Sequence, residues 1–155
     1  CVNYIGWLVN YDKTTYIIAD PSEVTSILNA FRAIGIDNVA GYFTPDVMKN
    51  GETVSLPLIT AAELAERINN EQVFVVDVRG KSEFDEQHIS GATHIPLGLL
   101  PDRLNEIPQD ATVVTQCASG YRSQIAASLL RSHGFANVYN LAEGKAAWSL
   151  ALPVE

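Results

Sequence analysis

Short apolar runs alternate with helix-like segments over the C-terminal two thirds of the chain. The runs at 73–77 and 112–115 have the length and composition of strands buried in a parallel sheet. Between and after them, apolar positions recur with helical spacing. This alternation predicts an α/β fold in which a parallel sheet carries helices on both faces.

Local signals set the bounds of the other predicted elements in this region. Residues 60–63 have the form of a capping box and predict a helix that continues through Ile68. Gly134 ends a predicted helix over 123–132. The remaining predicted elements are a short helix from Ser82, a strand at 93–96 interrupted by Pro96, a helix over 101–107, a strand at 137–141 and a final helix that includes 146–148.

The first fifty-odd residues predict a smaller strand–helix–strand unit. A strand-like run at 16–20 precedes an apolar-periodic helix at 24–34. The segment 35–39 that follows matches 134–138 in its pattern of glycine, asparagine and valine. We interpret residues 1–53 as a partial copy of the second half of the domain at 54–155, with a chance likeness between two strand–helix–strand units as the alternative.

The same alignment predicts that the N-terminal copy is inactive. It places Asp20 where Cys117 stands in the C-terminal domain, and the loop that follows is two residues shorter. That loop also lacks the glycine and the arginine that accompany Cys117.

Composition excludes several classes of function. The 155 residues are 47% hydrophobic, without an apolar run long enough to span a membrane, and no secretory signal is recognisable. The net charge of −8 argues against binding to nucleic acid. The chain has two cysteines and no zinc-ligand spacing, so we expect a reducing, cytoplasmic location without a disulfide framework, a metal or another cofactor.

The main candidate for chemistry is Cys117, which follows the strand at 112–115 and precedes the helix at 123–132. Unpaired backbone N–H groups and the helix dipole at such a position favour negative charge, so the thiol should ionise readily and act as a nucleophile. Gly120 permits a tight turn, and Arg122 adds a permanent positive charge. The predicted anion-binding loop comprises Ala118, Ser119, Gly120, Tyr121, Arg122 and Ser123.

Other interpretations of these residues remain open. A lone cysteine can simply be a buried apolar residue. Asp77 and Arg79 end a strand beside the predicted site, and we expect them to pair and support the loop rather than to act in catalysis. His88 and His94 are expected to be packing residues rather than ligands or bases.

The order and spacing of several motifs from Val73 to Trp148 resemble those of the rhodanese (sulfurtransferase) domain. The matching segments are Val76-Asp-Val-Arg79, Glu83-Phe84, His88-Ile-Ser-Gly-Ala92, Ile95-Pro96, Cys117-x-x-Gly-x-Arg-Ser123 and Leu141-x-x-Gly-x-x-x-Trp148. Glu143 departs from the pattern, because many family members carry a second glycine there.

The N-terminal segment resembles the inactive rhodanese repeat of a larger family, in which a metallo-β-lactamase-fold persulfide dioxygenase precedes an inactive and then an active rhodanese domain. This resemblance implies an iron-binding domain before Cys1, and hence no metal ligands within the chain. It also implies an attached or partner dioxygenase, while the incomplete N-terminal unit suggests a homodimer.

The rhodanese resemblance implies transfer of a sulfane sulfur through a persulfide on Cys117. Expected donors are thiosulfate and glutathione-type or other low-molecular-weight persulfides, and expected acceptors are thiols and cyanide. One alternative is a sulfur-carrier or regulatory docking module with little turnover. Another is a cysteine phosphatase or arsenate reductase, although the Cys-x4-Arg loop is one residue shorter than the Cys-x5-Arg loop of cysteine phosphatases.

Overall fold

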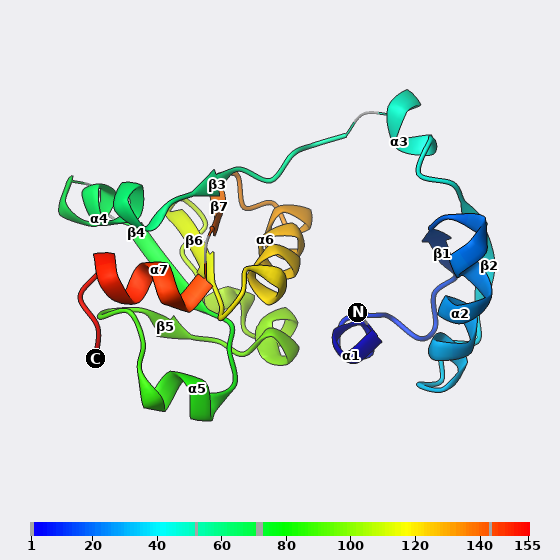
Figure 1. Ribbon diagram of the computed structural model, residues 1–155, viewed down its shortest axis with the longest axis horizontal. Coiled ribbons are helices and arrows are strands. Elements are labelled where there is room, and N and C mark those ends of the chain that lie inside the picture. Colours follow the sequence, from blue (N-terminus) through cyan, green and yellow to red (C-terminus); the bar gives the residue numbers. More distant parts are fainter. Residues whose placement is uncertain (1, 52, 71–72, 143) are drawn as a thin grey trace. The chain divides into compact units, whose positions relative to one another are not determined.

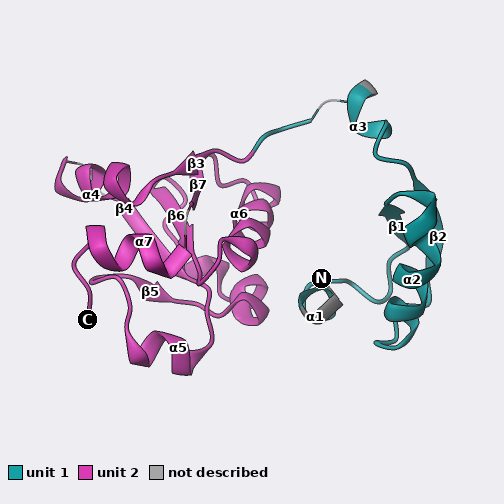
Figure 2. Cartoon of the chain, in the orientation of Figure 1, with its two compact units in different colours: residues 1–55 teal, residues 56–155 magenta. Residues whose placement is uncertain are grey.

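A computed structural model describes residues 2–51, 53–70, 73–142 and 144–155 of the chain (Figure 1). The chain divides into two compact units, residues 1–55 and residues 56–155 (Figure 2). The division lies two residues after the boundary predicted at 53/54.

The C-terminal unit is built on a five-stranded, wholly parallel sheet. Its strands are β3 (Leu58–Ile59), β4 (Val73–Asp77), β5 (Thr93–His94), β6 (Thr112–Gln116) and β7 (Val138–Leu141), in the spatial order β3-β7-β6-β4-β5. The two long apolar runs, β4 and β6, pair at the centre, as their burial on both faces requires.

Helices cover both faces of this sheet, as predicted (Figure 1). On one face lies α6 (Tyr121–Ser132), and on the other lie α4 (Ala61–Asn70) and α7 (Gly144–Ala151). Leu64 of α4 and Trp148 of α7 are fully buried in a cluster with Val114 of β6. The capping box at the start of α4 is present, because Glu63 accepts hydrogen bonds from both the backbone N–H and the hydroxyl of Thr60.

Several predicted bounds in this unit are wrong. The strand predicted at 93–96 is limited to β5, because Pro96 has no N–H to continue the ladder. The helix predicted at 101–107 is replaced by two 3₁₀ segments, Leu97–Asp102 and Leu104–Glu106, the first of which contains Pro101. The two-residue strand β3 was not predicted, since it is too short to show alternation. Two helices differ less: α5 (Lys81–Glu86) begins one residue before Ser82, and α6 begins two residues before Ser123.

The N-terminal unit has the predicted strand–helix–strand order, and its two strands are parallel. It comprises β1 (Thr15–Ile18), α2 (Pro21–Arg32) and β2 (Val39–Phe43), with two short helices, α1 (Val2–Ile5) and α3 (Val47–Asn50), that the sequence pattern did not predict. Its strand β1 ends two residues before the predicted limit, and α2 begins at Pro21, a residue favoured in a first helical turn. A small core forms around Ile17, Phe31 and Ile36.

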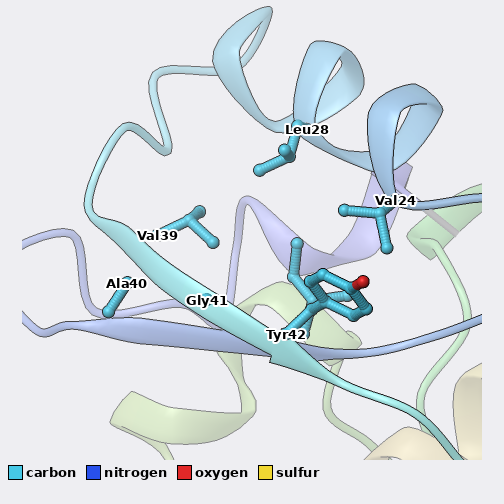
Figure 3. Close-up of a pocket in the computed structure, with 7 residues that line it drawn as sticks. Val24, Leu28, Val39, Ala40, Gly41 and Tyr42 are labelled. Carbon is cyan, nitrogen blue, oxygen red and sulfur yellow. The ribbon is translucent and has the colours of Figure 1, made fainter. Parts of the chain in front are cut away.

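An apolar hollow of about 100 Å³ lies between α2 and β2 of this unit (Figure 3). Val24 and Leu28 of α2 face Val39 and Tyr42 of β2 across it. Its volume is below the roughly 300 Å³ at which small-molecule sites begin, so we assign it to imperfect packing rather than to ligand binding.

Helices α2 and α6 end in the same way. Each has 12 residues and is followed by a glycine with positive φ, Gly35 at 79° and Gly134 at 91°. The N–H of Ile36 donates to Phe31 O at 3.0 Å, and the N–H of Phe135 donates to Leu130 O at 3.2 Å. Both bonds satisfy a carbonyl in the last helical turn.

Candidate functional site

Cys117 lies at the carboxyl end of β6, just before the loop that enters α6. The residue is only 1% exposed. Its Sγ lies 3.3 Å from Ser123 Oγ and accepts a hydrogen bond from the backbone N–H of Ser123 at 3.4 Å. The sulfur therefore sits inside the loop, against the first turn of the helix, where negative charge is favoured.

The conformation of the loop depends on two residues besides the cysteine. Gly120 has a φ of 84°, in the left-handed region that side chains disfavour, and it precedes the first residue of α6. Thr115 is fully buried on β6, and two backbone carbonyls can accept its hydroxyl proton. They are Ser123 O at 2.9 Å and Tyr139 O at 3.2 Å. These contacts fix the first turn of α6 against the end of the sheet.

The start of α7 contacts the other end of the loop. The N–H of Lys145 donates to Ala118 O at 3.0 Å. Gly144 has a φ of 62°, and a Cβ at this position would lie 2.2 Å from the same carbonyl oxygen. Two helix N-termini therefore meet at the loop, and no residue larger than glycine fits at position 144 without displacing it. Glu143, the departure from the family pattern, lies outside the described residues.

Arg122 belongs to the first turn of α6, and its guanidinium is bound by a carboxylate. Its two terminal nitrogens donate to the two Glu83 oxygens at 2.6 and 2.7 Å. This pairing, together with a hydrogen bond from the Gly80 N–H, lowers the pKa of the Glu83 carboxyl to about 2. Of the two roles open to Arg122, anion binding and holding the loop, the observed geometry is that of holding the loop to α5.

Asp77 and Arg79 form a buried ion pair at the end of β4. Arg79 Nη2 lies 2.6 Å from Asp77 Oδ2 and 2.8 Å from Gln87 O. The arginine also lies over the ring of Trp148, 5.4 Å from its centroid. In the sheet, Asp77 is the partner of Gln116, the residue before Cys117. That this ion pair supports the loop stays a prediction.

Two of the three histidines of this unit, His88 and His94, take part in packing. The rings of His88 and His94 stack against Phe84, with centroids 3.8 and 4.4 Å away. Among the described residues, no group of three or more histidine, cysteine or carboxylate side chains is arranged to hold a metal ion. No helix in the described ranges is long and apolar enough to cross a membrane.

The described residues between β1 and α2 of the N-terminal unit form no comparable loop. Asp20 directly precedes α2 and has extended backbone angles, so the strand passes into the helix without a turn like the one at 117–120. Sequence reasoning found the loop residues but assigned no role to Glu83, Thr115 or Gly144. Glu83 and Gly144 lie within the motifs that carry the resemblance, whereas nothing in the sequence distinguishes Thr115 from other strand residues.

The sequence model of the rhodanese-like domain family matches residues 60–151, which is more than half of the chain. The chain therefore belongs to the rhodanese-like family.

Its curated relatives include named sulfurtransferases. The chain is 38% identical over 92 residues to a sulfurtransferase of Allochromatium vinosum, covering 59% of this chain and 86% of that protein. It is 34% identical over 93 residues to the thiosulfate sulfurtransferase GlpE of Pseudomonas fluorescens, covering 60% and 85%. It is also 33% identical over 96 residues to YrkF of Bacillus subtilis, named as a candidate sulfur carrier; this match covers 61% of the chain but only 52% of YrkF.

Solved structures show the same fold. A rhodanese-related protein of Thermoplasma volcanium matches with a TM-score of 0.58 at 29% identity, over 64% of this chain and 97% of that one. A rhodanese-like domain protein of Staphylococcus aureus matches with a TM-score of 0.57 at 31% identity, over 60% and 91%. The predicted α/β rhodanese-like fold is thereby confirmed.

Proposed function

We propose that the C-terminal domain is a sulfurtransferase that carries a sulfane sulfur on Cys117. The observation that carries this proposal is the position of the Cys117 sulfur, which accepts the Ser123 N–H within the first turn of α6. Backbone donors and a helix N-terminus around a thiol stabilise both the thiolate and the persulfide anion that replaces it.

The reaction has two steps, as covalent catalysis by a cysteine requires. The Cys117 thiolate attacks the outer sulfur of the donor; a new S–S bond forms and the donor's own bond to that sulfur breaks. Thiosulfate leaves as sulfite, and an organic persulfide leaves as its thiolate. The Cys117 persulfide then passes its outer sulfur to a thiol, or to cyanide as thiocyanate, and the thiolate is restored.

Treatment with thiosulfate followed by intact-protein mass spectrometry tests the first step. We expect a mass gain of one sulfur, its loss on addition of cyanide with release of thiocyanate, and neither signal in Cys117→Ser. Transfer in Cys117→Ser comparable to that of the parent protein would overturn the assignment.

The alternative is a sulfur carrier or docking module that becomes persulfidated with little turnover. The near-complete burial of Cys117 and the similarity to YrkF favour it over phosphatase or arsenate reductase chemistry. A stable Cys117 persulfide without steady production of thiocyanate would identify the carrier, whereas release of phosphate from an aryl phosphate would identify a phosphatase.

We infer that the N-terminal unit is an inactive rhodanese repeat. The common termination of α2 and α6, and the direct passage from Asp20 into α2, support that interpretation. Its resemblance to dioxygenase–rhodanese fusions suggests a glutathione-type persulfide as the physiological sulfur compound. In Asp20→Cys, mass spectrometry after thiosulfate treatment should detect only one sulfane sulfur per chain, because the shortened loop provides no second site.

A further inference from the structure

Three cationic side chains lie beside the Cys117 loop, and each has a carboxylate partner. Arg122, in the loop segment itself, pairs with Glu83 at 2.6 Å. Lys145, whose backbone N–H contacts the loop, pairs with Glu86 at 3.3 Å. Arg79 pairs with Asp77 at 2.6 Å. The formal charges of these six side chains cancel, so the positive potential at the sulfur comes mainly from backbone N–H groups and helix N-termini.

Glu83 is the carboxylate bound to the loop's own cation. It engages both terminal nitrogens of Arg122, and one of its oxygens also accepts the Gly80 N–H at 3.1 Å. The Glu83 side chain is 37% exposed and that of Arg122 is 18% exposed, so solvent reaches the pair at the first turn of α6. The low pKa of Glu83 keeps its charge throughout the neutral range.

We propose that Glu83 selects sulfur donors by charge. It occupies the guanidinium that would otherwise bind the anionic group of a donor, and it repels additional negative charge near the loop. The site then disfavours dianionic thiosulfate relative to donors that bring one negative charge. This inference rests on the proposed sulfurtransferase function, which it narrows to donors whose reacting group carries a single negative charge, such as persulfides and thiosulfonates.

Two donors with the same type of reacting bond isolate the effect of charge. Thiosulfate and methanethiosulfonate each carry a terminal sulfur on a sulfonyl-type sulfur, but the first is a dianion and the second a monoanion. In both cases the Cys117 thiolate takes the terminal sulfur, the S–S bond of the donor breaks, and its electron pair leaves with sulfite or methanesulfinate. No oxidant or reductant is needed.

The experiment compares the parent protein with Glu83→Gln and Glu83→Ala. The measured quantity is the second-order rate constant for formation of the Cys117 persulfide at low salt. We expect the ratio of the thiosulfate to the methanethiosulfonate rate constant to rise about five- to tenfold in both variants, and this gain to shrink at high salt. Asp85→Asn is the matched control, because it removes one negative charge from the same helix at a residue paired with Lys81.

The outcomes separate this inference from the proposed function. A raised ratio in the Glu83 variants alone supports the inference. An equal change for both donors, or the same gain in Asp85→Asn, overturns it, because Glu83 would then act only on loop structure or on overall charge. If the parent protein forms no Cys117 persulfide with either donor, the proposed function itself is wrong.

Discussion

At the scale of single residues, the hydroxyl of Ser123 can donate its one proton to either of two hydrogen-bond partners. Ser123 Oγ lies 3.3 Å from Cys117 Sγ and 3.1 Å from Gly120 O. With a neutral thiol, the S–H can donate to Oγ while the hydroxyl donates to Gly120. When the sulfur is anionic, rotation of the hydroxyl proton toward Sγ supplies a second donor beside the Ser123 N–H.

Removal of this hydroxyl should therefore slow sulfur transfer. We expect Ser123→Ala to reduce the rate of Cys117 persulfide formation about tenfold, the loss that follows from removing one hydrogen bond to a charged group. Ser132→Ala is the control on the same helix. The Ser132 hydroxyl donates to Leu129 O at the C-terminal end of α6, whereas the Cys117 loop precedes its N-terminal end. Equal rates in the parent and Ser123→Ala, measured by stopped-flow or quenched mass spectrometry, would contradict this role.

The Glu83–Arg122 pair should make stability depend on pH in the acid range. The folded state lowers the Glu83 pKa from 4.5 to about 2, so its contribution to stability is complete above 4.5 and is lost as the pH falls towards 2. We expect the free energy of unfolding of Glu83→Gln to fall less steeply across this window than that of the parent protein. Urea unfolding at a series of pH values measures both slopes, and identical slopes would refute the linkage.

At the scale of secondary-structure elements, the start of α7 and the Cys117 loop must fit together. Gly144→Ala would place a methyl group against Ala118 O and hold alanine at positive φ. We expect it to lower stability by about 3 kcal/mol or to shift the loop, and in either case to abolish persulfide formation. Thermal unfolding and mass spectrometry measure the two effects.

Gly134→Ala separates the cost of a positive φ from the cost of a steric clash. Gly134 also has a positive φ, but a Cβ there would have no atom within 4 Å. This variant should lose only about 1 kcal/mol of stability and keep its sulfur transfer. If the two variants behaved alike, the close approach of α7 to Ala118 would have no part in building the site.

The same elements show how far the sequence could predict the structure. Continuous apolar runs located β4 and β6, a capping box located the start of α4, and the helical spacing of apolar residues located α6. The 3₁₀ segments and β3 were not predicted, because a proline interrupts the first 3₁₀ segment and β3 is too short to show a pattern. The loop was predictable from Cys117 and Gly120, which are local signals. The partner of Arg122 was not, because Glu83 lies 39 positions away and meets it only through the fold.

At the scale of the whole molecule, the two units differ in how well they cover their sheets. In the C-terminal unit, β6 has a neighbouring strand on each side and helices on both faces. In the N-terminal unit, the sheet has two strands, and Tyr16, Ile18 and Phe43 are 59%, 53% and 48% exposed. The rings of Tyr16 and Phe43 lie 5.7 Å apart, so these residues form part of one apolar surface.

Removal of residues 1–55 should leave sulfur transfer intact. Every residue proposed for the reaction lies in the unit at 56–155, which has its own core. We expect the shortened protein to form the Cys117 persulfide at the rate of the full chain. A loss of transfer with the fold retained by circular dichroism would mean that the N-terminal unit helps to build the site.

The same truncation should change the state of association. A two-stranded parallel sheet with open edges and exposed aromatic residues is prone to pair with another strand or sheet. A second copy of the chain offers the same surface, so we expect the full chain to form a dimer or larger assembly and residues 56–155 to be monomeric. Multi-angle light scattering over a range of concentrations measures both. If the full chain dimerises, the double variant Tyr16→Ser, Phe43→Ser should be monomeric and should still form the Cys117 persulfide. A full chain that stays monomeric at high concentration would rule out pairing through the N-terminal unit.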